Sequence, residues 1–129
     1  MRLKLDYTQR LNIHALMGQQ RCNVDEVRAF WRLQDELKLT KEEEKAINYT
    51  VAPSRNGDPP QATWSLTNQA ATEFDFPEED YQRVRRVIKE WQPGFLASDR
   101  LWLEPLLEQF DANDSKPELV GKKKASAAN

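Results

Sequence analysis

The segment from Asn23 to Leu39 constrains the fold most, because its apolar residues repeat at the period of an α-helix. Asn23 is a favoured N-cap residue, and Glu26, three positions later, completes a capping-box pattern. The apolar residues share one half of the helical wheel: Val24, Val27, Phe30, Trp31, Leu33 and Leu37. Such a stripe is unfavourable in water, so we expect a central core helix anchored by Phe30 or Trp31.

The other half of this helical wheel is charged. Arg32 and Glu36 have the i,i+4 spacing of a weak surface ion pair, which favours a solvent-facing side. The charged set consists of Arg28, Arg32, Asp35 and Glu36.

The residues before this helix predict a second helix that packs against it. Leu3 and Leu5 alternate with polar residues, which indicates a short extended start. From Tyr7 the spacing becomes helical, and Gly18 is a typical C-terminal stop. Because the connection to Asn23 is short, we expect a helical hairpin.

The middle of the chain predicts a short helix followed by a small sheet. Thr40 and Glu43 form a capping box for a helix that reaches about residue 47. Extended segments at 49–52 and 61–66 flank a turn that contains Asn56-Gly57, a strong hairpin signal. Because 73–76 is a third extended segment, we expect an antiparallel sheet of two or three strands.

The last third predicts two more helices. Pro77 suits the first position of a helix, and an apolar stripe follows: Tyr81, Val84, Val87, Ile88 and Trp91. Pro93-Gly94 ends that helix. Ser98 or Asp99 can cap a final helix to about Phe110, with a kink or restart at Pro105.

These elements predict an α+β fold that is mostly helical, with about five helices and a small antiparallel sheet in the middle of the chain. We expect one compact domain over residues 1–110. Residues 111–129 contain few large apolar side chains and three consecutive lysines, so they predict a disordered basic tail.

Composition excludes several classes of function. The net charge is −2, which argues against a nucleic-acid-coating protein or a polybasic membrane binder. A single cysteine excludes an intrachain disulfide and a cysteine-based zinc site, and suits a reducing compartment. The chain has no long apolar run, so we expect a cytoplasmic protein that does not bind membranes.

Several short segments resemble the layout of small uncharacterised bacteriophage and prophage accessory proteins. These segments are 5–11 (LDYTQRL), 39–44 (LTKEEE), Thr63-Trp64-Ser65, 73–76 and 107–110. The resemblance implies a phage-like setting in the host cytoplasm. It offers no catalytic residues to transfer to this chain.

The sequence offers little catalytic chemistry. His14 and Cys22 are the only histidine and cysteine, and no third residue is placed to orient them as a nucleophile pair. Phosphate-cradling glycine loops, hydrolase elbows and dinucleotide motifs are also absent from the sequence. We therefore expect a protein that is not an enzyme and needs no metal or cofactor.

A cluster of cations on the helix that follows Pro77 is the best candidate for a binding site. Arginine next to aromatic rings suits contacts to phosphates, nucleobases or acidic surfaces. The candidate residues are Arg83, Arg85, Arg86 and Lys89, with Tyr81 and Trp91. The competing interpretation is a solvated helix face balanced by Glu78, Glu79 and Glu90.

Three functions remain open at this point. The first is a non-enzymatic interaction protein, such as a counter-defence inhibitor of a host protein or a chain that forms homo-oligomers. The second is a sequestering protein for a phosphorylated small molecule, such as a nucleotide signal. The third is a nucleic-acid-binding module, which the near-neutral net charge disfavours.

Overall fold

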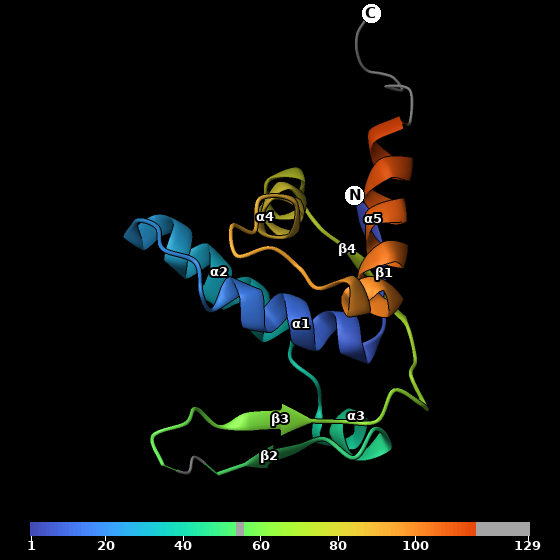
Figure 1. The fold of residues 1–129 in the computed structure, drawn as a ribbon. Helices are drawn as coiled ribbons and strands as arrows, with labels where there is room; N and C mark the ends of the chain where they lie inside the picture. The colour runs from blue at the N-terminus through green and yellow to red at the C-terminus, as the bar shows by residue number, and fades with distance from the viewer. Residues whose placement is uncertain (54–55, 116–129) are drawn as a thin grey trace, which may run out of the picture. The chain divides into compact units, whose positions relative to one another are not determined.

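The computed structural model describes residues 1–53 and 56–115, and it has the mostly helical α+β fold that the sequence predicts (Figure 1). Within the described residues the chain divides into two compact units, with the boundary between Phe95 and Leu96. The first unit contains β1 (Arg2–Leu5), α1 (Tyr7–Met17), α2 (Val24–Leu37), α3 (Lys41–Ala46), β2 (Thr50–Ala52), β3 (Gln61–Thr63), β4 (Thr72–Asp75) and α4 (Glu78–Lys89).

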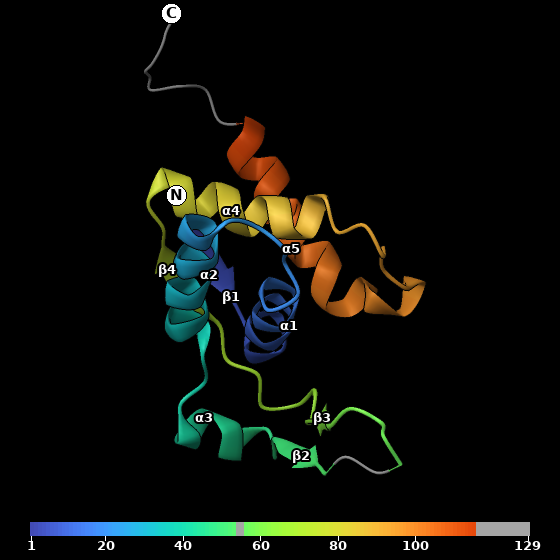
Figure 2. The same ribbon diagram turned by 90° about the vertical axis from the view of Figure 1, so that its left-hand side faces the viewer.

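Three helices form the core of the first unit. Helices α1 and α2 lie side by side as the predicted hairpin, and α4 runs across them (Figures 1 and 2). Their buried side chains include Ile13, Phe30, Leu33, Leu37, Tyr81, Val84 and Ile88. These helices cover one side of α2, where Phe30, Leu33 and Leu37 are buried. Side chains on the other side of α2 are exposed.

Gly18 ends α1 as predicted, but not through a left-handed backbone. Its φ is −66°, which any residue can adopt. A Cβ at this position would lie 3.2 Å from Nε2 of Gln34, and that amide donates to the carbonyl oxygen of His14 at 3.0 Å. Glycine therefore serves the close approach of α2 to the end of α1.

The third extended segment is a strand, but it pairs with the N-terminal strand instead of with the central hairpin. Strands β1 and β4 are antiparallel, with Leu3 opposite Phe74. Leu3 and Leu5 are fully buried, because their alternation places both on the core side. Pairing of β4 with β1 accompanies the burial of these leucines. Because β4 pairs there, the central hairpin has two strands and not three.

That hairpin consists of β2 and β3, with Val51 opposite Ala62. In its loop, Asn56 and Gly57 have φ values of 52° and 81°, the left-handed region that an Asn-Gly pair tolerates best. Just after β3, the ring nitrogen of Trp64 donates to Oγ1 of Thr8 at 2.9 Å. This bond links the hairpin to α1.

The second unit begins with a 3₁₀ turn, Ala97–Asp99, followed by α5, Arg100–Ser115. The Asp99 carboxylate accepts from the backbone N–H of Leu96, so it closes the 3₁₀ turn that precedes α5. Helix α5 does not restart at Pro105, and it continues past Phe110 to Ser115. The first five residues of the tail predicted at 111–129 thus belong to α5, and the rest of that tail, 116–129, lies outside the described residues.

Candidate functional site

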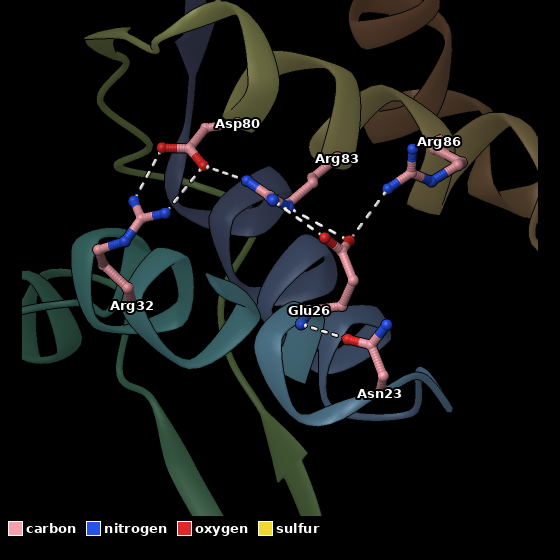
Figure 3. Close-up of polar contacts among 6 residues, drawn as sticks. All are labelled: Asn23, Glu26, Arg32, Asp80, Arg83 and Arg86. Atoms are coloured by element: carbon pink, nitrogen blue, oxygen red, sulfur yellow. Dashed lines mark hydrogen bonds and ion pairs between the residues drawn. The ribbon is translucent and has the colours of Figure 1, made fainter. Parts of the chain in front are cut away.

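The cations predicted as a binding site on α4 lie partly against α2, where they meet carboxylates (Figure 3). Arg83 donates to Oδ1 of Asp80 at 2.9 Å and to Oε2 of Glu26 at 3.0 Å. Arg86 reaches the other oxygen of Glu26, Oε1, at 3.4 Å. Two of the four predicted cations therefore join the two helices.

Asp80 is the centre of this network. Arg32 of α2 makes a bidentate contact with it, at 2.8 and 3.0 Å to its two oxygens. Asp80 is 4% exposed, so both of its arginine partners hold a nearly buried charge. Bidentate arginine–carboxylate pairs are stronger and more directional than single contacts. We call Glu26, Arg32, Asp80, Arg83 and Arg86 the α2–α4 clamp.

The clamp shifts the ionisation of its carboxylates. Hydrogen bonds from Arg32 hold the pKa of Asp80 below its usual value, although burial opposes this shift. Hydrogen bonds from Arg83 likewise lower the pKa of Glu26. Both acids are therefore ionised in the folded chain, and their charges compensate the arginines.

These contacts correct three expectations. Asn23 caps α2 by accepting from the backbone N–H of Glu26, but the Glu26 side chain pairs with Arg83 and Arg86 instead of closing a capping box. Arg32 makes its ion pair with Asp80 rather than with Glu36. Glu26 and Asp80 therefore balance Arg83 and Arg86, in place of the carboxylates proposed from sequence for these two cations, Glu78, Glu79 and Glu90.

The other members of the predicted site differ widely in exposure. Tyr81 is fully buried, so its ring belongs to the core and is not offered to a ligand. Arg85 and Trp91 are half-buried, and Lys89 is exposed at the end of α4. The predicted site of converging cations and aromatic rings is thus divided between the core, the clamp and the surface.

The opposite side of α2 exposes two residues that were expected in the core. Trp31 is 59% exposed and Val24 is 64% exposed, whereas Phe30 is 4% exposed. At about 100° per residue the apolar stripe spans half of the wheel, and the core covers only the part around Phe30, Leu33 and Leu37. Phe30 is therefore the core anchor, and Trp31 points away from the core.

Two charged residues flank Trp31 on this outer side. Arg28 and Asp35 are exposed, and within the described residues neither side chain makes a hydrogen bond or an ion pair. The outer side of α2 contains residues spaced by four, three and four positions, the spacing of neighbours on one helix face: Val24, Arg28, Trp31 and Asp35. They form a line along α2 opposite the core, which we call the Trp31 face.

A small groove lies where α1 meets the end of α2, with a volume of about 150 Å³. It contains Arg10, a buried arginine that the sequence did not single out. Arg10 donates to the carbonyl oxygens of Leu37 and Lys38 and to Glu43, so its guanidinium satisfies the end of α2. The donors of Arg10 are thus engaged inside the fold.

His14 also lines this groove, and its pKa is lowered by burial and by nearby Lys38. Cys22 lies exposed in the connection between α1 and α2. Within the part of the chain that the structure describes, no hydrogen bond joins these two residues. The structure therefore does not assemble the nucleophile pair considered from sequence.

In residues 1–53 and 56–115, no three histidine, cysteine or acidic side chains cluster as a metal site. No helix in this same part is long and apolar enough to cross a membrane. The chain matches no protein-family model, no curated protein and no solved structure.

Proposed function

We propose that this chain is a non-enzymatic protein that acts by binding another protein through the Trp31 face. The observation that carries the proposal is Trp31, a large aromatic side chain that is 59% exposed on the side of α2 opposite the core. Tryptophan and arginine are enriched among residues that dominate binding energy at protein interfaces. The Trp31 face presents both, three residues apart on one helix.

The cost of this exposure supports a binding role. A tryptophan side chain buries up to about 250 Å² when it is covered, so the exposed part of Trp31 offers about 3 kcal/mol of hydrophobic free energy. The fold of the first unit gains none of this energy. A protein partner that covers the ring would gain it.

The two other functions have weaker support. A phosphorylated ligand needs available cations in a pocket, but Arg83, Arg86 and Arg10 are engaged by carboxylates or carbonyl oxygens. The groove beside Arg10 is about 150 Å³, below the roughly 300 Å³ at which ligand pockets begin. Nucleic-acid binding is disfavoured by the net charge of −2.

The partner that we propose is either a host protein or a second copy of the chain. In the first case the protein would act as an inhibitor that covers part of a host protein. Both cases use the same exposed face. A test of the face itself therefore comes before a test of the partner.

Photo-crosslinking provides that test. A photoreactive phenylalanine analogue replaces Trp31 in one variant and Leu66 in a control, because Leu66 is similarly exposed, at 58%, in the segment after β3. We expect protein adducts from position 31 only, in the cells that carry the gene. Adducts from neither position, or equal adducts from both, would contradict the proposed function.

A further inference from the structure

We propose that the Trp31 face binds a second copy of this chain, with the two α2 helices antiparallel about a two-fold axis beside Trp31. This inference rests on the proposed function, because it names the partner of the same face. It follows from the order of charges along α2, from their exposure and from the position of the tryptophan between them.

The charges around Trp31 are self-complementary. Arg28 precedes it by three residues, and Asp35 follows it by four. When a second α2 lies antiparallel with the two Trp31 rings side by side, each Arg28 lies within one residue, about 1.5 Å along the axis, of the level of Asp35 of the other copy. Two opposite-charge contacts then flank one aromatic contact, and the two-fold axis makes both contacts equivalent.

The parallel arrangement is disfavoured by the same residues. It would place Arg28 beside Arg28 and Asp35 beside Asp35, so that like charges repel at both ends of the contact. It would also place the positive ends of the two helix dipoles side by side, and likewise the negative ends, which is unfavourable. Antiparallel helices instead bring each positive end beside a negative end. Charge therefore selects one orientation of the second copy.

Arg28 and Asp35 are available for such contacts. Both side chains are exposed, and within the described residues neither is committed to an ion pair, in contrast to the arginines of the clamp. Val24 extends the apolar contact from Trp31 toward the start of α2 and is itself 64% exposed. The Trp31 face thus has an apolar centre with charges of opposite sign on either side.

The contact is small, because it uses one side of a helix of 14 residues. Interfaces that bury less than about 1,200 Å² in total are typical of weak, transient complexes. We therefore expect a dimer that dissociates on dilution and that weakens as salt screens the exposed charges.

Sedimentation velocity over a concentration series tests the proposal with five proteins. These are the parent chain, Trp31→Ala, Arg28→Asp, Asp35→Arg and the double variant Arg28→Asp/Asp35→Arg. We expect the parent chain to dimerise and Trp31→Ala to remain monomeric. Each single charge variant places like charges opposite one another, so each should also remain monomeric.

Mixing the single charge variants is the decisive measurement. One variant then presents two acids and the other presents two arginines, so the mixture should form a heterodimer although neither variant dimerises alone. The double variant restores the complementary pattern in reverse and should dimerise as the parent chain does. Circular dichroism should show that all variants remain folded, because the substituted side chains are exposed.

Three results would overturn the proposal: a parent chain that stays monomeric at every concentration, single variants that still dimerise, or a mixture that does not associate. These results leave the proposed function testable on its own. Crosslinking from position 31 to a different protein would then retain the binding face and assign it another partner. Failure of both experiments would reject the face itself.

Discussion

The two sides of α2 carry the same types of residue but use them differently. The side toward α4 carries Glu26 and Arg32, whose charges are compensated by Arg83 and Asp80 of the same chain. The outer side carries Arg28 and Asp35, which form no hydrogen bond or ion pair among the described residues, although Asp35 is near enough to His14 to oppose the lowering of that imidazole's pKa by burial. Phe30 and Trp31 differ in the same way, since one is buried and the other exposed.

This comparison shows that a charge cluster in a sequence does not by itself identify a binding site. The dense cations of α4 predicted a binding site because they are close together in sequence, yet Arg83 and Arg86 pair with Glu26 within the fold. The sparse charges beside Trp31 (Arg28 and Asp35) belong to the half of the wheel predicted to face solvent, and both are exposed. The two clusters differ in whether another helix supplies opposite charges: α2 supplies Glu26 to Arg83 and Arg86, whereas Arg28 and Asp35 form no such pair among the described residues.

The largest expected effect tests the apolar half of the comparison. Phe30→Ala should lower the free energy of unfolding by about 3–5 kcal/mol, because it leaves a cavity where a 4% exposed ring was packed. Trp31→Ala should change it by less than about 0.5 kcal/mol, as expected for a surface position. Urea unfolding of both variants, at concentrations where the chain is monomeric, provides the measurement.

Phe30→Leu keeps most of the volume and serves as the control if Phe30→Ala does not fold. Its loss of stability should be intermediate between those of the two alanine variants. If Trp31→Ala destabilises the monomer as much as Phe30→Ala does, the outer side of α2 is part of the core and the comparison fails.

The next effect concerns the clamp. Asp80→Asn removes the charge that Arg32 and Arg83 share, and it should lower the free energy of unfolding by about 2–3 kcal/mol. Glu79→Gln is a matched control in the same turn of α4, where only the favourable helix-dipole term of about 0.5 kcal/mol is lost. Equal melting temperatures for the two variants would show that the clamp contributes no stability.

The smallest expected effect is the pH dependence of the clamp. The pKa of Asp80 is lower in the folded chain than in the unfolded chain, so the unfolded state binds more protons in acid. The stabilisation by Asp80 is complete above its unfolded pKa and is lost as pH falls from about 5 toward 2. Asp80→Asn should therefore lose less stability than the parent chain over this range.

Unfolding free energies of both chains at several pH values provide the comparison. Glu26 remains in both chains with its own lowered pKa, so Asp80→Asn should keep part of the acid sensitivity. Parallel curves for the two chains would show that Asp80 is not the carboxylate that responds.

Local sequence signals predicted most of the secondary structure correctly. Asn23 and Thr40 cap α2 and α3, and Asn56-Gly57 lies in the hairpin loop with the left-handed backbone that this pair tolerates. These features depend on residues that are close in sequence. A side chain three positions away can satisfy a helix end whatever the rest of the chain does.

The clamp was only partly predictable. Asp80 and Arg83 have the i,i+3 spacing of a helix pair, which is a local signal. The link from Glu26 to Arg83 spans 57 positions, and nothing near Glu26 indicates it. The contacts of the buried Arg10 could not be predicted from nearby residues either, since its acceptors include the carbonyl oxygen of Leu37 at the end of another helix.

The sequence by itself determined which segments form helices and strands, because caps, turns and periodicity act over a few residues. It also determined that Val24, Phe30 and Trp31 lie on one half of a helical wheel. Only the tertiary structure decided which of them is buried. A helix with a broad apolar stripe can pack through several of its sectors, and the positions of α1 and α4 select the sector around Phe30 and leave Trp31 exposed.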